Sequence, residues 1–242
     1  MPHDYFGEEV AARYDESSED MFDPAVVEPT VAFLAELAGE GPALELGIGT
    51  GRIALPLAQR GIRLAGIDLS EAMVGRLREK PGAEEIEVTI GDFATTKVEG
   101  SFSLVYLVFN TINNLTTQDA QVACFENAAS HLAPGGCFVI EVGVPRLRSI
   151  PPGEKIHVFY FESSERMGFD EYDVVDQGLI SHHIRDGEVR SIPFRYVWPA
   201  ELDLMARIAG MTLRERWADW NREPFTSEST KHVSVWEKPR SD

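Results

Sequence analysis

The sequence predicts an open α/β sheet that is mostly parallel, with a small antiparallel β unit attached after it. Two observations predict the sheet. Short apolar runs of strand length alternate with helical patterns between residues 41 and 145, and a glycine-rich turn follows the first of these runs. A third observation predicts the attached unit, because from Pro145 onward strand-like segments follow one another without long helices between them.

The core segments follow in order from apolar spacing and from helix end signals. Residues 25–38 carry apolar side chains at helical spacing, and Gly39 ends that pattern. Ser70 is typical of a residue that caps a helix start. The predicted strands are the ALEL run before the glycine-rich turn, 63–68, 86–90, 102–109 and 137–142. The predicted helices between them are 52–60, 70–80 and 117–132. Because strand–helix–strand crossovers are right-handed, this alternation predicts a parallel sheet with helices on both faces.

The later segments predict an insert and then a return to the core sheet. Asp186-Gly187 is a tight hairpin signal within the insert. The predicted strands of the insert are 156–161, 172–184 and 189–198. A helix over 200–209 precedes two final strands near 212–220 and 232–236. We therefore expect four parts: an N-terminal helical segment (1–40), an α/β core (41–145), an antiparallel β insert or lid (146–199), and a C-terminal helix and strand pair that completes the core sheet (200–242).

The composition limits the partners and the compartment. The 242 residues include 22 Lys or Arg against 40 Asp or Glu, so the net charge is −18. This charge argues against a nucleic-acid partner and an anionic membrane surface. The acidic excess either forms a solvated face that favours solubility, or it repels phosphorylated substrates and tolerates neutral or cationic ones. No apolar run approaches the roughly 20 residues of a membrane helix. Cys124 and Cys137 lack the spacing of a metal site. We therefore expect a soluble cytoplasmic protein without a bound metal.

Carboxylates at three successive strand ends predict a nucleoside site. Glu45 opens the run Glu-Leu-Gly-Ile-Gly-Thr-Gly, whose glycines allow a sharp turn and a close approach of ligand to backbone. Asp68 ends the second strand and can accept hydrogen bonds from both hydroxyls of a ribose. Asp92, followed by Phe93, ends the third strand and can accept from an adenine amino group beside an aromatic wall. Because open α/β sheets bind ligands at the carboxyl ends of their strands, these side chains are expected to share one site.

Five pieces of the chain occur together in the order and spacing of one protein family. They are ALELGIGTGRIALPLA (43–58), LAGIDLSEAMV (64–74), IEVTIGDF (86–93), FSLVYLVFNTINNL (102–115) and HLAPGGCFVIEV (131–142). On these pieces the chain resembles class I S-adenosylmethionine-dependent methyltransferases. It looks most like small-molecule methyltransferases that carry a β-rich insert after the fifth strand. The resemblance implies a Rossmann-like seven-stranded sheet, S-adenosyl-L-methionine as cofactor, and methyl transfer to nitrogen or oxygen of a small-molecule acceptor.

The resemblance also implies which residues contact the cofactor. Gly47, Gly49 and Gly51 would pass beneath its methionine part, Glu45 would orient their loop, and Asp68 would hold the ribose. The other implied contacts are Leu69 and Met73 on the adenine, Asp92 at the adenine amino group with Phe93 beside it, Phe109 and Asn110 near the reacting methyl, and Tyr14 closing over the cofactor.

Two other functions fit parts of the same pattern. A nicotinamide dinucleotide enzyme shares the glycine turn and the second-strand acid, but its fingerprint is G-x-G-x-x-G, whereas this chain has G-x-G-x-G followed by Arg52. A binding protein that holds the nucleoside without turnover would carry the same glycines and acids. Persistent binding without a methylated product would identify the binder.

The acceptor side of the site is less determined by the sequence. Methyl transfer needs approach geometry and exclusion of water more than a dedicated base, so the catalytic residue stays unknown. The candidate bases are His157, His182, His183, Tyr160, Tyr196 and Glu141, and none is chosen. His182 shares a strand face with Ile180 and Ile184, which favours a packed histidine. Asn113 and Asn114 could bind a polar acceptor or cap a turn. The aromatic insert could serve as a lid or as a contact in a possible homodimer.

Overall fold

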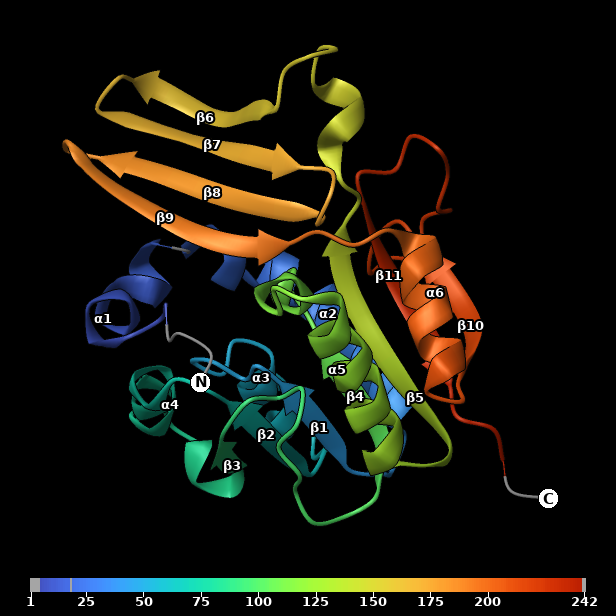
Figure 1. Ribbon diagram of the computed structural model, residues 1–242. Coiled ribbons are helices and arrows are strands. Elements are labelled where there is room, and N and C mark those ends of the chain that lie inside the picture. The colour runs from blue at the N-terminus through green and yellow to red at the C-terminus, as the bar shows by residue number, and fades with distance from the viewer. Residues whose placement is uncertain (1–4, 18, 241–242) are drawn as a thin grey trace.

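The computed structural model describes residues 5–17 and 19–240, and it contains two β-sheets (Figure 1). The larger sheet has seven strands in the order β10-β11-β5-β4-β1-β2-β3. Its strands are β1 (Ala43–Leu46), β2 (Leu64–Asp68), β3 (Glu87–Ile90), β4 (Phe102–Leu107), β5 (Leu132–Gly143), β10 (Thr212–Trp217) and β11 (Lys231–Glu237). Only β11 runs against its neighbours, since it pairs antiparallel with both β5 and β10. The predicted open, mostly parallel, Rossmann-like sheet is confirmed.

Helices cover both faces of this sheet (Figure 1). The α-helices are α1 (Glu8–Ser17), α2 (Pro24–Ala38), α3 (Ala54–Gln59), α4 (Glu71–Arg78), α5 (Gln118–His131) and α6 (Pro199–Ile208). Short 3-10 turns lie at η1 (Glu19–Phe22), η2 (Ala83–Glu85), η3 (Thr111–Asn114) and η4 (Arg146–Ser149). Ser70 caps α4 as predicted, because its hydroxyl accepts a hydrogen bond from the Met73 amide at 3.3 Å.

Two apolar cores explain the layering. On one face, α5 and α6 pack on the sheet around Phe125, whose ring meets Phe138 and Trp236 edge-on at centroid distances of 5.1 and 5.3 Å. On the other face, α2 and α3 pack through Phe33 and Leu57. Successive strand residues point to opposite faces, so a central strand covered on both faces must be apolar throughout. The four residues of β1 are all buried and three of them are apolar; the exception is Glu45, whose carboxyl group accepts a hydrogen bond from Tyr106.

The insert is a separate four-stranded antiparallel sheet above the carboxyl edge of the core, with β9 nearest the core (Figure 1). Its strands are β6 (Ile156–Ser163), β7 (Arg166–Asp173), β8 (Gly178–Arg185) and β9 (Glu188–Arg195). Asp186 and Gly187 have φ values of 53° and 83°, which fit the predicted two-residue hairpin between β8 and β9.

One predicted strand, residues 172–184, is wrong. The chain turns between Asp173 and Gly178, so this segment contains the end of β7 and most of β8. Val174 and Val175 made the segment look continuous, yet both side chains point to solvent. The Asp173 carboxylate accepts a hydrogen bond from the Val175 amide at 2.8 Å, and Gln177 has a φ of 55°. An Asx turn closed by a left-handed residue therefore outweighs the β propensity of two valines.

The order of the central strands sets the position of a site. β1 lies between β4 and β2, so the chain winds outward in one direction from β1 and in the other from β4. Loops that leave the carboxyl ends of β1 and β4 therefore part from each other, and open α/β sheets bind ligands in the crevice between such loops. Among the helices of the described residues, none is long and apolar enough to cross a bilayer.

Candidate functional site

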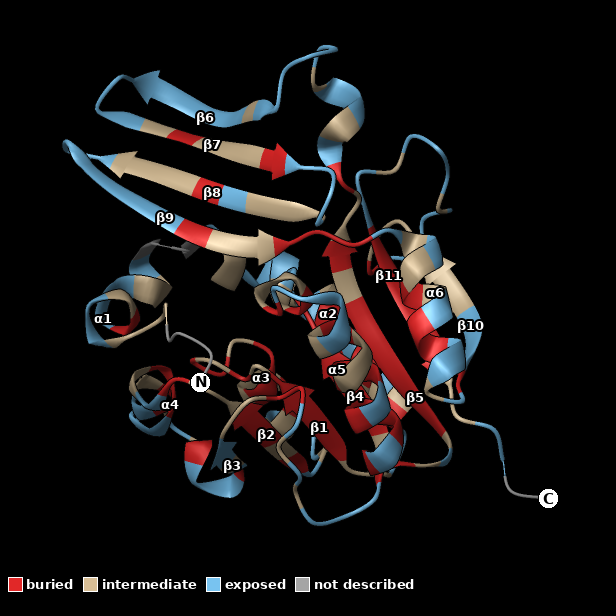
Figure 2. Ribbon diagram, in the orientation of Figure 1, coloured by how far each residue is buried: buried red, intermediate tan, exposed pale blue. Residues whose placement is uncertain are grey.

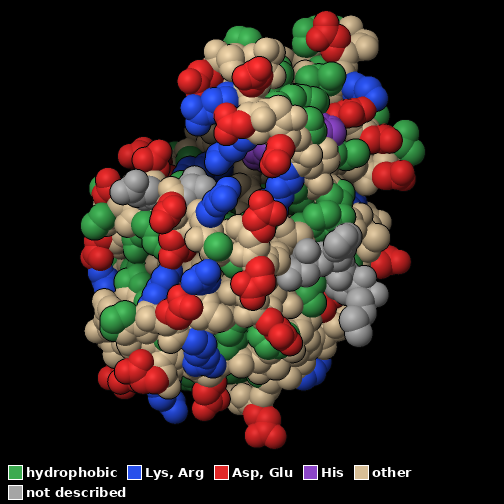
Figure 3. Space-filling view, turned by 90° about the vertical axis from the view of Figure 1, so that its left-hand side faces the viewer, with side chains coloured by type: hydrophobic (Ala, Val, Ile, Leu, Met, Phe, Trp, Pro, Cys, Tyr) green, Lys and Arg blue, Asp and Glu red, His purple; other side chains and the backbone are tan. Residues whose placement is uncertain are grey.

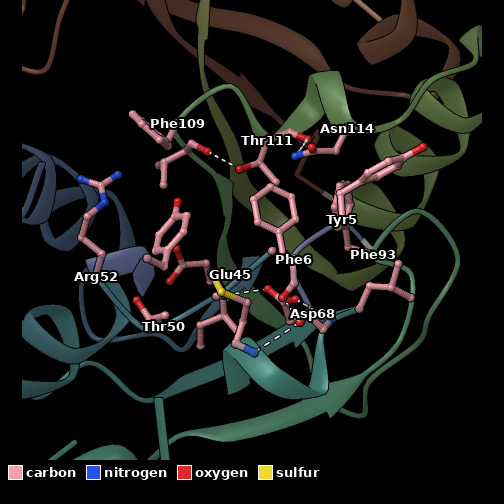
Figure 4. A pocket seen from close by; sticks show the side chains of 18 of the residues that line it. Tyr5, Phe6, Glu45, Thr50, Arg52, Asp68, Phe93, Phe109, Thr111 and Asn114 are labelled. Atoms are coloured by element: carbon pink, nitrogen blue, oxygen red, sulfur yellow. Dashed lines mark hydrogen bonds between the residues drawn. The ribbon is translucent and has the colours of Figure 1, made fainter. Parts of the chain in front are cut away.

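A cavity of about 330 Å³ lies at the carboxyl edge of the sheet, where the loops after β1 and β4 separate. This volume is within the range of small-molecule sites. Its wall takes residues from the ends of β1, β2, β3 and β4, from the N-terminal segment and from β9. The site residues predicted from the sequence that line it are Tyr14, Glu45, Gly47, Gly49, Asp68, Leu69, Met73, Asp92, Phe93 and Phe109. In Figure 4, Arg52 and Thr50 lie on one side of the cavity, Phe93 and Tyr5 on the other, and Asp68 between them.

The glycine-rich turn uses the conformational freedom of its glycines. Gly47, Gly49 and Gly51 have φ values of 72°, 53° and 81°, a region that side chains with a Cβ rarely adopt. A Cβ on Gly47 would lie 2.7 Å from the Thr111 Cγ2 atom of the β4 loop. The loops after β1 and β4 therefore approach each other too closely for any residue but glycine at position 47. Because the glycines have no side chains, the backbone of the turn is open to the cavity.

Gly51→Ala is expected to destabilise the fold more than Gly61→Ala does. Both glycines have positive φ, so both substitutions carry the backbone penalty of roughly 1–2 kcal/mol. A Cβ on Gly51 would also lie 2.3 Å from Leu77 Cδ1, and Leu77 is fully buried, whereas nothing lies within 4 Å of a Cβ on Gly61. The extra cost for Gly51 should be about 1–3 kcal/mol by urea unfolding. Equal losses for the two variants would contradict this packing argument.

Asp68 joins the ends of β1 and β2. One carboxylate oxygen accepts a hydrogen bond from the Gly49 amide at 2.6 Å, and the other accepts from the Ser70 amide at 2.9 Å. The side chain is therefore oriented by two backbone donors, one in the glycine turn and one at the start of α4. Each carboxylate oxygen can accept more than one hydrogen bond, so the group keeps acceptor capacity toward the cavity.

The end of β3 supplies the next wall of the cavity. Asp92 accepts a hydrogen bond from the Ala94 amide at 2.9 Å, which fixes the carboxylate in a turn. Phe93 follows it and is buried against the core. Met73 reaches the same cavity from α4, with its methyl group 3.4 Å from the position that a Cβ on Gly49 would take. A carboxylate beside a flat ring and a thioether is a surface that suits a purine with an amino group.

Glu45 is a buried carboxyl group at the end of β1. Its Oε2 atom accepts a hydrogen bond from the Tyr106 hydroxyl at 2.8 Å, and both residues are almost fully buried. Burial raises the pKa of Glu45 to about 8, although the Tyr106 hydrogen bond and the positive charge of Arg52 act in the opposite direction. Burial and the neighbouring Glu45 raise the pKa of Tyr106 well above its usual value. Glu45 thus carries a proton on its carboxyl group at neutral pH for much of the time.

Arg52 and the loop after β4 close the far side of the cavity. The guanidinium of Arg52 lies over the Phe109 ring at 5.2 Å from its centroid. Phe109 and Asn110 have φ values of 57° and 61°, so two consecutive non-glycine residues adopt a left-handed conformation. Such strain is common at functional sites. The Asn110 carboxamide oxygen accepts from the Gly143 amide at 2.7 Å, which ties this loop to the end of β5.

The N-terminal segment covers the cavity. Tyr14 is half-buried on the cavity wall, and burial raises its pKa. The Phe6 ring meets Tyr14 edge-on at 6.3 Å, and the Phe6 carbonyl accepts from the Ser70 hydroxyl at 2.8 Å. Asp15 accepts from the Thr50 hydroxyl at 2.6 Å. These contacts hold α1 and the residues before it against the glycine turn.

Comparisons with known proteins decide the family. A family model described as a methyltransferase domain matches residues 43–136. The solved structure of the CcbJ methyltransferase from Streptomyces caelestis is 36% identical, covers 98% of this chain and 98% of its own, and has a TM-score of 0.83. This chain is a class I S-adenosylmethionine-dependent methyltransferase. Its cofactor is therefore S-adenosyl-L-methionine.

Two further relatives are less similar to the methyltransferase. The cypemycin N-terminal methyltransferase of a Streptomyces species is 27% identical over 238 residues, which cover 93% of this chain and 97% of that protein. The glycopeptide N-methyltransferase MtfA, solved in complex with S-adenosyl-L-methionine, is 18% identical, covers 88% of this chain and 94% of its own, and has a TM-score of 0.63. At that identity the second likeness concerns the fold alone.

The residues present fit the cofactor. An adenosyl group needs acceptors for its hydroxyls, an acceptor for its amino group and an apolar wall, and the methyltransferase offers Asp68, Asp92 and Phe93 on one cavity. A methionine carboxylate needs a donor, and Arg52 is the basic side chain among the described residues of the lining. The bare backbone at Gly47 and Gly49 leaves room between these two regions.

Not every residue predicted from the sequence lies at the cavity of the methyltransferase. Gly51 and Asn110 do not appear among its described lining residues and instead shape the two loops behind it. The candidate bases His157, His182, His183, Tyr160, Tyr196 and Glu141 are likewise not among the described lining residues, although the Glu141 carboxylate accepts a hydrogen bond from the Phe109 amide at 3.2 Å. His182 stacks on Phe169 at 4.6 Å, as the pattern of its strand predicts. Asn114 lines the cavity and also caps η3, with its amide donating to the Thr111 carbonyl at 3.1 Å.

Sequence reasoning missed several lining residues. Arg52 had a visible signal, because it directly follows the last glycine of the turn. Tyr5, Phe6 and Pro193 had none that a linear pattern carries, since the first two come from the N-terminal segment and the third from β9 of the insert. Only the folded chain shows that these distant segments meet over the glycine turn.

Proposed function

We propose that the enzyme transfers the methyl group to the nitrogen of a small-molecule amine. One observation carries this choice between nitrogen and oxygen. Among the described residues that line the cavity, none is His, Lys or Cys, and the histidines of the insert lie elsewhere. An alcohol must lose a proton to a positioned base as it reacts, whereas a neutral amine has a lone pair and can release its proton to water. A lining without His, Lys or Cys, in which Asp68 and Asp92 are assigned to the cofactor and Glu45 is held by the Tyr106 hydroxyl, therefore suits an amine.

The charge and one relative support the same acceptor class. A net charge of −18 attracts a cationic amine from solution, which releases a proton to water before its nitrogen lone pair can react, and it repels phosphorylated compounds. Figure 3 shows a hollow between the insert and the core, with basic side chains near its rim. These side chains do not attract a cation, so the attraction of a cationic amine comes from the net charge of the whole molecule. The cypemycin N-terminal methyltransferase, similar over nearly the whole chain, is named for the N-terminus of its acceptor, a position that carries an amino group in a peptide.

We further propose how the site holds its cofactor. When bound, S-adenosyl-L-methionine supplies an electrophilic methyl group on a sulfonium sulfur. Asp68 would accept from the ribose hydroxyls, and Arg52 would pair with the methionine carboxylate. The proposed contacts for the adenine are Leu69, Met73, Asp92 and Phe93, and those for the methionine part are Tyr14, Glu45, Gly47, Gly49 and Phe109. Gly51 and Asn110 would shape the two loops behind these contacts. This chain's own contribution is then to orient the two reactants and to exclude water.

The acceptor class is tested with isotopically labelled cofactor and paired acceptors. Purified enzyme is incubated with methyl-labelled S-adenosylmethionine and a panel of small amines, each matched to the alcohol of the same skeleton. Labelled product from the amines and not from the alcohols supports the proposal. Methyl recovered on oxygen would overturn it. Calorimetric binding of S-adenosylhomocysteine without product from any member of a wide panel would favour a binding protein.

A further inference from the structure

Glu141 lies near the carboxyl end of β5, where it contacts the loop after β4. Figure 2 shows β5 buried over most of its length, and the Glu141 side chain is only 14% exposed. Its Oε2 atom accepts a hydrogen bond from the Phe109 amide at 3.2 Å, and its Oε1 atom lies 3.5 Å from Lys231 Nζ. The main-chain carbonyl of Glu141 accepts from the Asn110 amide, also at 3.2 Å. Glu141 therefore binds two consecutive residues of the loop, one through its side chain and one through its backbone.

The two residues that Glu141 binds are in a left-handed conformation. Phe109 and Asn110 have φ values of 57° and 61°. Asparagine adopts this region more readily than most residues with a Cβ, whereas a bulky side chain such as phenylalanine is an outlier there. Such an outlier persists only when the surrounding structure holds it in place. The hydrogen bond to Glu141 acts on Phe109 directly, and the bond from the Gly143 amide to the Asn110 side chain, at 2.7 Å, acts on its neighbour.

The left-handed conformation places the Phe109 ring beside Arg52. Phe109 lines the cavity, and the Arg52 guanidinium lies over its ring, 5.2 Å from the centroid. In Figure 4 both residues lie at the end of the cavity away from Phe93. A guanidinium is attracted to the face of an aromatic ring, so the ring restrains the cation. Arg52 also donates a hydrogen bond to the Met21 carbonyl at 3.3 Å, so its orientation depends on the ring and on one backbone acceptor.

We propose that Glu141 is a positioning residue for the methionine end of the cofactor. Its carboxylate holds the Phe109 amide, and the Phe109 ring then holds Arg52 where it pairs with the methionine carboxylate. This step rests on the cofactor contacts proposed above. Without Glu141 the loop occupies its left-handed conformation for only part of the time. The apparent affinity for a ligand falls in proportion to the fraction of the protein that is competent to bind it.

The geometry favours this role over that of a general base. A base needs to be within hydrogen-bond reach of the proton that it removes. The Glu141 carboxylate contacts Phe109 with one oxygen and Lys231 with the other, and Glu141 is not among the described residues that line the cavity. Its contacts are therefore with the loop that shapes the site.

The test compares two ligands by isothermal titration calorimetry. S-adenosylhomocysteine carries the amino and carboxyl groups of the methionine part, whereas 5′-methylthioadenosine has the same adenosyl group and a thioether but lacks both. We expect Glu141→Ala to weaken the binding of S-adenosylhomocysteine about tenfold, as for a loop that is correctly placed about a tenth of the time. The same variant should bind 5′-methylthioadenosine as the wild type does, because that ligand has no carboxylate for Arg52.

Three further variants identify the interaction that matters. Glu141→Gln keeps an acceptor for the Phe109 amide and should recover most of the affinity for S-adenosylhomocysteine. Lys231→Met removes the ion pair and leaves the carboxylate, so it should bind both ligands as the wild type does. Glu141→Asp keeps the charge on a side chain one methylene shorter, and it should lose affinity as Glu141→Ala does. It replaces Glu141→Ala in the comparison should near-ultraviolet circular dichroism show that the alanine variant is not folded.

A double-mutant cycle tests whether Glu141 acts through Phe109. Phe109→Ala removes the ring under Arg52, so Glu141→Ala should cause no further loss of affinity in that background. Two losses that simply add would show that Glu141 acts by another route and would overturn the proposal.

Three other results would also overturn it. Equal losses for both ligands in Glu141→Ala would indicate a general loosening of the site. A Glu141→Gln variant as weak as Glu141→Ala would assign the effect to charge rather than to the hydrogen bond. Unchanged binding of S-adenosylhomocysteine by Glu141→Ala, together with a loss in Arg52→Met, would remove the positioning role and leave the cofactor contacts intact. An Arg52→Met variant that binds S-adenosylhomocysteine as the wild type does would instead refute the pairing of Arg52 with the carboxylate, and this proposal with it.

Discussion

Asp68→Ala is expected to weaken the binding of S-adenosylhomocysteine by about 3 kcal/mol, or roughly 150-fold. The loss has two sources. The cavity loses the carboxylate that we propose for the ribose hydroxyls. In addition, the Gly49 amide loses its acceptor at 2.6 Å and the Ser70 amide loses its acceptor at 2.9 Å. The turn that lies under the cofactor is then held less firmly, so the binding entropy also becomes less favourable.

Isothermal titration calorimetry measures this loss, and two further variants separate its sources. Asp68→Asn retains one carbonyl oxygen for the backbone amides, so it should lose less affinity than Asp68→Ala. Asp119→Ala removes an exposed carboxylate at the start of α5, away from the described lining of the cavity, and should bind as the wild type does. Unchanged affinity in Asp68→Ala would contradict the assignment of the ribose to this residue.

The core of the fold could be predicted because its signals are local. β1, β2 and β4 are largely apolar runs of four to six residues, and each neighbouring helix has a cap or a glycine stop beside it. The right-handed crossover then predicts a parallel sheet with helices on both faces. The same logic brought Glu45, Asp68 and Asp92 to one edge, since carboxyl ends of adjacent parallel strands must lie together.

The rest could not be predicted because it depends on contacts between distant segments. The carbonyl of Tyr5 accepts from Arg190 across 185 positions of sequence, and the hydroxyl of Ser70 donates to Phe6 across 64. Nothing in the sequence near Tyr5 indicates that it will reach the cavity. The side-chain oxygen of Asn110 turns toward Gly143, although the position of the residue after β4 suggested a role on the cavity wall. Position along a strand is predictable, whereas side-chain direction in a strained loop is not.

The stability of the protein is expected to fall by about 2 kcal/mol between pH 6.5 and pH 8 because of Glu45. In the folded chain burial raises the pKa of this carboxyl from 4.5 to about 8. The folded state therefore holds a proton that the unfolded state has already released. The stability that this group contributes is complete below the unfolded pKa of 4.5 and is lost as pH rises toward 8. Unfolding in this range releases a proton, and release of a proton becomes more favourable as pH rises.

The upper part of this range isolates Glu45 from the histidines. Burial lowers the pKa values of His131, His183 and His232, for His232 to about 3. A lowered histidine pKa has the opposite sign, because stability is then lost as pH falls below 6.5. These groups therefore affect the acid side, and they are neutral in both folded and unfolded chains well above pH 6.5. Both the wild type and Glu45→Gln contain these histidines, so the difference between their slopes from pH 6.5 to 8 reports on the carboxyl group.

Urea unfolding of the wild type and of Glu45→Gln across pH 6.5–8 tests this assignment. Glutamine has the same shape, accepts a hydrogen bond from the Tyr106 hydroxyl and does not titrate, so the variant should lack the fall in stability that this carboxyl group causes. Tyr106→Phe removes the hydrogen bond that favours the charged carboxylate, so it should raise the pKa of Glu45 and move the loss of stability to higher pH. An identical slope in the wild type and Glu45→Gln would show that another group holds the proton.

Because the same carboxyl group lies on the cavity wall, loss of its proton also changes the charge that the bound cofactor meets. The affinity for S-adenosylhomocysteine should therefore vary with pH in this range for the wild type and not for Glu45→Gln.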